Sequence, residues 1–293
     1  MDRMLADVHI LHESDVYRIL DFRCHCNICS LTDVEYNDTL CISFVRKGFF
    51  EYRTFRRNDE VHIGRILITK PGIEHVTRHI DNQPDISTVF EFKKSFFERL
   101  KSEYDTHASW FLQNKDMHAI LLACPIDADY LHFQVMDAIQ RKRVDRLYID
   151  DMVMQMVNSI LLLLGNATDL PVVPDRVKRN HLHTIEKAKE YMLNNLVQDI
   201  SLNELAEYCY VSPFHFSRLF KSILNVSPHQ YLLSARLNHA RILLSSTDKS
   251  VNDIGFESGF NSLEHFVTAY KQQYQLTPSQ QRLGLKDLRM KNI

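Results

Sequence analysis

The sequence predicts a multidomain chain with an N-terminal all-β barrel, helices after it and a C-terminal all-α domain. Three features of the 293 residues predict this fold class. Residues 10–92 are short β-branched and aromatic runs separated by turn residues, residues 95–164 carry helical periodicity, and residues 200–282 contain a helical unit that occurs twice. An apolar content of 45% and a charged content of 25% are typical of globular domains with ordinary cores.

The C-terminal unit is a duplication. SLNELAEYCYVSPFHF (201–216) returns as SVNDIGFESGFNSLEHF (250–266). Matching residues are 49 positions apart from Leu205 onward and 50 apart from Phe216 onward. One residue has therefore been gained in the middle of the unit, which indicates a turn that tolerates a change in length.

The first copy carries the start signals of two helices. Ser201 with Glu204 forms a capping box, and Ser212 is an N-cap with Pro213 at the first helical position. The second helix then has an inward stripe of Phe216, Leu219, Phe220 and Ile223, and an outward face of Phe214, His215, Ser217, Arg218 and Lys221. Two short helices joined by a tight turn, the second with a polar outer face, are typical of a helix-turn-helix.

The second copy repeats this pattern. Ser250 and Asp253 are its first caps, Gly259 and Phe260 form its turn, and Asn261 is the expected cap of its second helix. The outward residues of that helix are Leu263, Glu264, Thr268 and Lys271. Between the copies, Pro228–Leu244 reads as a long amphipathic helix that acts as a rigid spacer.

These residues resemble the AraC/XylS family of bacterial transcription regulators. The likeness runs through FSRLFK, SPHQYLLSARLNHARILL, GFNSLEHF and TPSQQR. It implies sequence-specific binding to double-stranded DNA, activation through contact with RNA polymerase, and a homodimer. In that family a glycine usually follows each recognition helix, whereas this sequence has Asn225 and Gln275. Glutamine is costly in a left-handed conformation, so we expect the second recognition helix to end differently from the first.

We expect the two recognition helices to contact DNA unequally. Arg218 offers paired donors suited to guanine, and the second helix has no counterpart to it. Lys271 is expected to contact phosphate. The full predicted set of DNA contacts is Phe214, Ser217, Arg218, Lys221, Leu263, Glu264, Thr268 and Lys271.

Charge divides the chain in the same way. Residues 1–174 hold 20 Lys and Arg against 26 Asp and Glu, a net of −6, and residues 175–293 hold 15 against 11, a net of +4. A basic C-terminal half suits phosphate binding. The apolar run 160–164 is far shorter than a membrane helix, and residues 1–10 have no apolar signal core. We therefore expect a cytoplasmic protein without a membrane partner.

The β-rich region contains one further resemblance. GRILITKPGIEHVTRH (64–79) is similar to the second motif of the cupin barrels through Gly64, Pro71, Gly72 and His75. A cupin-like barrel implies a small-ligand cavity, for which Tyr52, Arg53 and His75 are candidate polar contacts. No His-x-His precedes the motif, and no nucleophile with a base and no phosphate loop is evident. We therefore expect no cofactor and no enzymatic activity; the alternative is a cupin-type metalloenzyme with a helical appendage.

Six cysteines in a chain of this kind do not indicate a disulfide framework. Cys24 and Cys26 fall on one face of a strand, and Cys29 follows three residues later. We interpret the first two as small buried apolar side chains. The alternative is a metal- or redox-responsive regulator that uses Cys24, Cys26 and Cys29, with His75 as a further ligand.

The region after residue 94 is predicted to be helical, with Ser95 as the first cap. The longest helix has an apolar stripe of Ile149, Met152, Val153, Met156, Val157, Ile160, Leu161 and Leu164. In regulators of the resembled family a helical pair at this position joins two subunits, so Met152–Leu163 is the expected dimer contact. Gly165, Pro171 and Pro174 then interrupt the periodicity. The expected domains are a regulatory barrel (1–94), a helical dimerisation region (95–164), a linker (165–180) and a DNA-binding domain (181–293).

Overall fold

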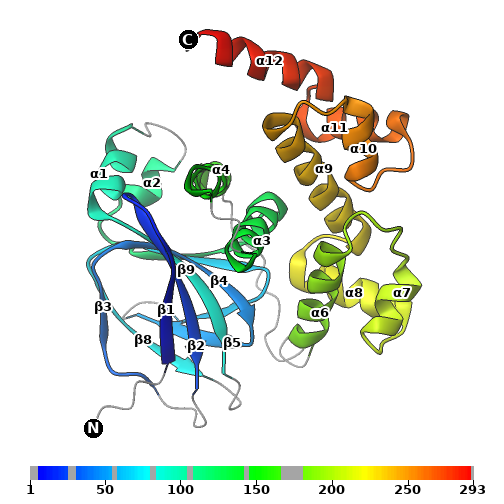
Figure 1. Cartoon of the computed structure of the whole chain (residues 1–293). Coiled ribbons are helices and arrows are strands. Elements are labelled where there is room, and N and C mark those ends of the chain that lie inside the picture. Colours follow the sequence, from blue (N-terminus) through cyan, green and yellow to red (C-terminus); the bar gives the residue numbers. More distant parts are fainter. Residues whose placement is uncertain are drawn as a thin grey trace. The chain divides into compact units, whose positions relative to one another are not determined.

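The computed structural model describes residues 6–25, 31–54, 58–79, 84–103, 108–141, 145–165 and 181–291. The chain divides into two compact units, Met1–Glu186 and Lys187–Ile293 (Figure 1). The first unit holds the strands and the second is helical, as the sequence predicts. Almost all of the expected linker, residues 166–180, lies outside the described residues.

The N-terminal unit contains two antiparallel sheets. One has six strands in the order β1-β2-β9-β4-β7-β10, and the other has four in the order β3-β8-β5-β6. Their bounds are β1 Ala6–Glu13, β2 Tyr17–Cys24, β3 Glu35–Asn37, β4 Leu40–Lys47, β5 Phe49–Arg53, β6 Asn58–His62, β7 Arg65–Thr69, β8 Ile73–His79, β9 Ile86–Phe92 and β10 Ala119–Ala123. The sequence therefore predicts the β-rich character of this region correctly.

Several boundaries differ from the expectation. Strand β1 begins before residue 10. The sequence pattern does not reveal this start, because β1 is an edge strand whose apolar residues Val8 and Ile10 are exposed and do not alternate with buried ones. Strand β10 lies inside the region expected to be helical, since a run of five apolar residues looks alike in a strand and in a buried helix. Asn58 and Asp59, residue types that are common in turns, here start the edge strand β6.

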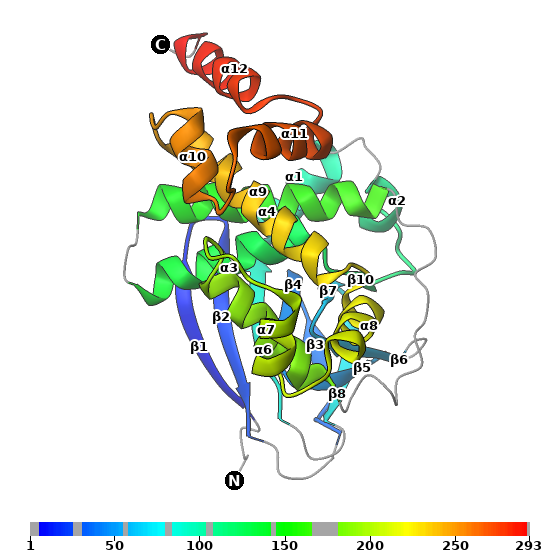
Figure 2. The ribbon, with the colours of Figure 1, turned by 90° about the vertical axis from the view of Figure 1, so that its right-hand side faces the viewer.

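Helices follow the strands of the first unit. They are α1 Lys94–Glu103, α2 Ser109–Leu112, α3 Ile126–Gln140 and α4 Arg146–Gly165. Ser95, the expected cap of α1, lies within its first turn, because the carbonyl of Lys93 accepts the first helical hydrogen bonds from Phe96 and Phe97. Helices α3 and α4 lie side by side (Figure 2).

Helices α3 and α4 cover one face of the six-stranded sheet. The ring of His132 in α3 stacks on Phe44 of β4 at 4.4 Å, and the Tyr17 hydroxyl of β2 donates to Asp150 of α4 at 2.5 Å. Since side chains alternate along a strand, the intervening residues of these strands face the opposite side of the sheet. That opposite face is turned toward the four-stranded sheet.

The apolar stripe of α4 is part of this core. All eight of its predicted members, from Ile149 to Leu164, are buried. By length and composition alone, Arg146–Leu164 is apolar enough to cross a membrane, with a mean hydropathy of 1.4, but burial of the stripe is what a core helix requires. On the outer face of α4, Leu147 and Leu162 are exposed.

The second unit consists of helices, and the duplication predicted from the sequence is visible in them. The helices are α6 Leu182–Asn194, α7 Leu202–Tyr208, α8 Pro213–Leu224, α9 Pro228–Ser246, α10 Val251–Glu257, α11 Leu263–Tyr274 and α12 Pro278–Lys291. Helices α7 and α8 form the first copy and α10 and α11 the second, with α9 between them (Figure 2). A Cβ atom on Gly255 would lie 2.9 Å from the Phe266 ring, so this glycine allows α10 and α11 to approach closely.

Within the second unit, the predicted caps are confirmed with one exception. Ser201, Ser212, Ser227 and Ser250 each accept a hydrogen bond from the backbone three residues on, and Ser201 and Ser227 complete capping boxes. The expected cap Asn261 is wrong: Ser262 caps α11 and accepts from the His265 N–H at 3.2 Å. Ser262 matches Ser212 at the offset of 50, so the gained residue lies in the turn, before the cap.

The ends of the two recognition helices also correct an expectation. Asn225 and Gln275 both adopt the left-handed conformation, with φ of 62° and 59°. The second helix therefore ends in the same way as the first, although glutamine is less suited to this conformation. The Gln275 side chain donates to the Gln272 carbonyl at 3.0 Å, which offsets part of the cost.

Helix α9 joins the two copies through a point where three segments meet. The Arg236 Nε donates to the Leu196 carbonyl at 2.9 Å, and its second nitrogen donates to the Gln198 carbonyl at 2.5 Å. In the turn of the second copy, a Cβ atom on Gly259 would lie 2.8 Å from both Arg236 and Leu196. Only glycine fits there, and its φ of 84° is also the conformation that glycine prefers.

We predict that Gln275→Gly raises the free energy of unfolding of the helical unit by about 1 kcal/mol, because glycine removes the left-handed strain at φ 59°. Chemical denaturation followed by circular dichroism at 222 nm measures the change. Asn225→Gly is the matched control, with a smaller gain since asparagine tolerates this conformation. A decrease on Gln275→Gly would mean that the lost hydrogen bond to Gln272 outweighs the relieved strain.

Candidate functional site

The N-terminal unit contains a cavity of about 560 Å³ between its two sheets. The six-stranded sheet contributes Leu20, Ser43, Leu67 and Val89, and the four-stranded sheet contributes Tyr36, Phe50, Tyr52, His75 and Thr77. This volume lies within the range of small-molecule sites. Among the described residues that line the cavity, none is lysine or arginine, and several are carboxylates.

Tyr52 and His75 are two of the three predicted ligand contacts, and both line this cavity. Their rings stack at 4.7 Å. Tyr52 is 3% exposed, and its hydroxyl has no hydrogen-bond partner within the described part of the chain. The His75 Nε2 lies 3.5 Å from Glu35, and its Nδ1 is buried without a partner there.

The third predicted contact, Arg53, is not brought to the cavity. Arg53 follows Tyr52 on β5, so its side chain points to the opposite face of the sheet. There it forms an ion pair with Glu51 at 2.5 Å. Period-2 alternation could have separated Arg53 from Tyr52 at the sequence level.

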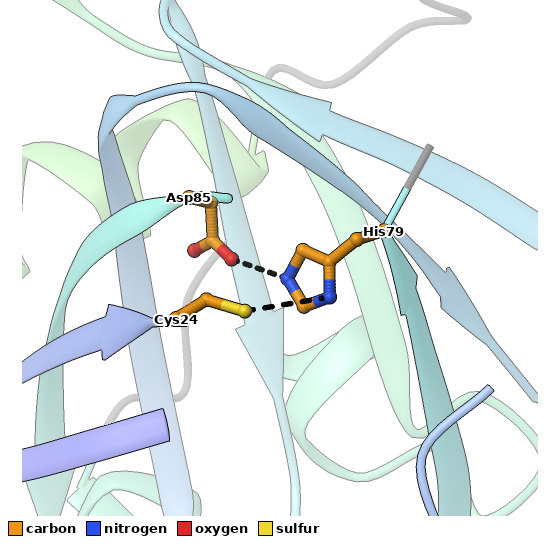
Figure 3. A group of neighbouring side chains, drawn as sticks. All are labelled: Cys24, His79 and Asp85. Atoms are coloured by element: carbon orange, nitrogen blue, oxygen red, sulfur yellow. Dashed lines mark hydrogen bonds and ion pairs between the residues drawn. The ribbon is translucent and has the colours of Figure 1, made fainter. Parts of the chain in front are cut away.

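A second group on the cavity wall consists of Cys24, His79 and Asp85 (Figure 3). The Cys24 sulfur lies 3.6 Å from the His79 Nδ1, and the His79 Nε2 lies 2.6 Å from an Asp85 carboxylate oxygen. The other oxygen of Asp85 accepts from the Ser87 hydroxyl at 2.6 Å. All three residues are buried. The imidazole lies between the thiol and the carboxylate and contacts both.

Electrostatics fix the protonation of His79. Burial alone lowers its pKa, but hydrogen bonds to Asp85 and Cys24 outweigh burial and raise the pKa to about 9. His79 is therefore an imidazolium at neutral pH, and it donates to both neighbours. Cys41 lines the same cavity without an imidazole partner among the described residues, and burial raises the pKa of its thiol to about 11.

The structure describes only one of the three cysteines of the metal-binding alternative, Cys24. Cys26 and Cys29 lie outside the described residues, and the structure brings His79 and Asp85 to Cys24, so that their donor atoms all lie within 4.8 Å of one another. Three donors are fewer than the four of a closed structural zinc site. Sequence reasoning missed Asp85, because it precedes β9 in a loop with no ligand spacing.

The outer face of α8 presents the predicted residues of the first helix-turn-helix. Phe214, Arg218 and Lys221 are exposed, with Phe214 at 73%, and Ser217 is half-buried. The Arg218 guanidinium lies 5.6 Å from the centre of the Phe214 ring. This contact orients Arg218 outward before any partner is bound.

The outer face of α11 is similar in arrangement and poorer in positive charge. Leu263, Glu264, Thr268 and Lys271 are all exposed, as predicted. The opposite face of the helix packs Phe266, Ala269 and Tyr270 into a core shared with α9 and α10. Each copy thus turns its second helix outward on a buried base, which is the arrangement that places a helix in the DNA major groove.

Comparison with known proteins agrees with this geometry. A family model described as a helix-turn-helix domain matches residues 205–283, which include both recognition helices. Among curated relatives, the HTH-type transcriptional regulator ArgR of Pseudomonas aeruginosa is 35% identical over 118 residues, 40% of this chain and 36% of ArgR. The C-terminal domain is a helix-turn-helix domain of the AraC/XylS type.

Two further relatives place this AraC/XylS-type domain in context. The uncharacterised HTH-type regulator YdeC of Bacillus subtilis is 21% identical over 257 residues, which cover 86% of each chain. A solved AraC-type DNA-binding domain from Chromobacterium violaceum is 35% identical, with a TM-score of 0.34, over 36% of this chain and 95% of that one. The chain spans only about a third of the length of ArgR, so the likeness to ArgR concerns the AraC/XylS-type domain.

We predict that the stability of the N-terminal unit depends on pH through His79. Because the folded pKa of about 9 lies above the ordinary value of 6.5, His79 stabilises the fold fully below pH 6.5, and this contribution is lost as pH rises through 9. Denaturation followed by the fluorescence of Trp110, the one tryptophan of the chain, measures it. His79→Gln should flatten the slope between pH 6.5 and 9, whereas the exposed control His9→Gln should keep it; an unchanged slope in His79→Gln would contradict the assignment.

Proposed function

We propose that this protein is a sequence-specific DNA-binding transcription regulator controlled by a small molecule in its N-terminal cavity. The observation that carries the proposal is the pair of outward-facing recognition helices, α8 and α11, on one helical unit of the AraC/XylS type. Double-stranded DNA is the partner that such a pair fits.

The spacing of the helices favours unequal use of the two copies. Helix α9 has 19 residues and is therefore about 28 Å long at 1.5 Å per residue. Successive major grooves on one side of straight DNA are about 34 Å apart. This distance is slightly greater than the length of α9, so the two recognition helices do not both fit fully into successive grooves of straight DNA. We propose that α8 inserts and reads bases through Arg218, while α11 contributes mainly phosphate contacts such as Lys271.

The effector is proposed to be a small organic molecule without a net negative charge. The cavity supplies the buried hydroxyl of Tyr52, the unpartnered Nδ1 of His75 and aromatic walls. No lysine or arginine among its described lining residues would balance an anion. This chemistry favours a neutral or cationic ligand that can accept a hydrogen bond from Tyr52.

The remaining parts of the proposal come from the family resemblance. A cupin-like role for the N-terminal sheets, activation through RNA polymerase and a homodimer joined near Met152–Leu163 all belong to it. The apolar stripe of α4 is buried in the core of the N-terminal unit. A dimer contact in this region would therefore use the outer face of α4, with Leu147 and Leu162. Size-exclusion chromatography with light scattering tests the dimer directly.

We predict that Arg218→Ala weakens binding to a selected DNA target by about 1–3 kcal/mol and relaxes the preference at one base pair. Fluorescence anisotropy with the target and its single-base variants measures both effects. Lys271→Ala is the matched comparison: it should weaken binding to all sequences alike and reduce the salt dependence. If Arg218→Ala also weakens all sequences alike, Arg218 is a phosphate contact and not a base reader.

We predict that Tyr52→Phe keeps or slightly raises the stability of the ligand-free protein, since it removes a buried hydroxyl without a described partner. The same change should reduce the stabilisation given by an effector found in a metabolite screen by thermal shift. Thr77→Val, on the same cavity, is a control for loss of another hydroxyl. An effector that stabilises Tyr52→Phe and the unmodified protein equally would show that Tyr52 is not a contact.

A further inference from the structure

We propose that Cys24 is a reactive thiol that forms covalent adducts with small, soft electrophiles, such as α,β-unsaturated carbonyl compounds, that enter the N-terminal cavity. The group Cys24, His79 and Asp85 is then a chemical modification site. It is separate from the DNA contacts, and it lies in the same cavity as the proposed effector but differs from reversible binding in forming a covalent bond.

The geometry supplies each element of an activated nucleophile. Cys24 Sγ lies 3.6 Å from His79 Nδ1, and an Asp85 carboxylate oxygen accepts a hydrogen bond from His79 Nε2 at 2.6 Å. A nucleophile beside an imidazole that a carboxylate orients is the arrangement found in thiol and hydroxyl catalysis. Asp85 is itself held by Ser87, and its backbone carbonyl accepts from the Cys24 N–H at 3.0 Å. The three groups are therefore fixed to one another through β2, β8 and the residue before β9.

The site has room and a second polar group for a ligand. Cys24, His79 and Asp85 all line the 560 Å³ cavity, and so does Tyr52. The Tyr52 hydroxyl is buried, and within the described part of the chain no group accepts from it or donates to it. An electrophile with a carbonyl oxygen would supply the acceptor that this hydroxyl lacks.

The covalent step is balanced without an oxidant or a leaving group. In the reactive form of the pair, the sulfur is a thiolate and the proton resides on His79 Nδ1. The sulfur lone pair forms a bond to the β-carbon of the electrophile, and the π electrons of the C=C bond move to the α-carbon. The proton of His79 Nδ1 is then transferred to that carbon, which leaves a thioether and a neutral imidazole.

Cys41 gives an internal comparison within the same cavity. Burial raises the pKa of the Cys41 thiol to about 11, and its sulfur contacts the Thr39 hydroxyl, the Asn37 amide oxygen and the Thr69 side chain. No imidazole lies beside it among these contacts. Because the thiolate is the nucleophile, Cys41 should be nearly inert at neutral pH while Cys24 reacts.

The test is labelling of the full-length protein with N-ethylmaleimide at pH 7.5, a neutral Michael acceptor of small size. Quenched samples are digested, and adduct formation is followed at each cysteine by mass spectrometry. We expect Cys24 to react at least about tenfold faster than Cys41. Since the readout does not involve DNA, its outcome is independent of whether the protein binds an operator.

Substitutions distinguish activation of the Cys24 thiol by His79 from exposure of Cys24 in a loosened fold. His79→Gln and the milder Asp85→Asn should slow labelling of Cys24 and leave the rates of Cys41 and Cys209 unchanged, because the fold stays intact. A merely structural role predicts the opposite sign, with faster labelling of both Cys24 and Cys41 as the N-terminal unit opens, while Cys209 in the second unit keeps its rate. His9→Gln, an exposed histidine on β1, is the matched control and should change no rate.

Three results would overturn the proposal. The first is labelling of Cys24 no faster than that of Cys41. The second is an unchanged Cys24 rate in both His79→Gln and Asp85→Asn. The third is one equivalent of Zn²⁺ that survives dialysis, blocks labelling of Cys24 and is lost in both Cys24→Ser and His79→Gln, since that result would assign the cluster to a metal ion.

Discussion

The geometry of the DNA-binding unit depends on the side chain of Arg236. From the middle of α9 it donates to two carbonyls in the segment after α6, Leu196 and Gln198, and it lies against Gly259 in the turn of the second copy. A guanidinium group can satisfy two carbonyls at once, which a single hydrogen bond could not do with the same directional control. The first and second copies are thus related through one side chain as well as through the axis of α9.

The N-terminal unit depends on a different constraint, the alternation of side chains along its strands. In β4 and β9, Phe44 and Phe90 pack against His132 of α3, while Ser43 and Val89 face the cavity. The helices therefore complete a core on one side of the six-stranded sheet and leave the other side to line the cavity. Changes to the cavity wall can be made with little effect on the packing of α3 and α4.

The sequence predicts most of the second unit because its signals are local. Caps, proline at the first helical position and the inward stripes each depend on a few neighbouring residues, and they place α7 to α11 almost correctly. The errors occur where a local preference is overridden. Asn261 is a good cap in isolation but occupies the gained turn position, and Gln275 takes a left-handed conformation because the chain must turn into α12.

The sequence predicts less of the cavity, because its chemistry depends on strand pairing. His75 and His79 lie on the same face of β8, and only the pairing of strands within each sheet together with the packing of the two sheets on each other determines that His79 meets Cys24 of β2. Asp85 joins them from a loop, without any spacing that would predict it. Tyr52 lines the cavity and Arg53 does not, although a single step along the strand separates them.

The contact of Arg218 with Phe214 has a consequence for the speed of recognition. A long side chain that is free in solution must be ordered during binding, and this loss of rotamer entropy opposes association. Here the aromatic ring, itself 73% exposed, already holds the guanidinium over α8. Part of the ordering is thus completed in the unbound protein, and in the base reading that we propose for Arg218 the Phe214 ring would contribute by holding the guanidinium, without touching a base itself.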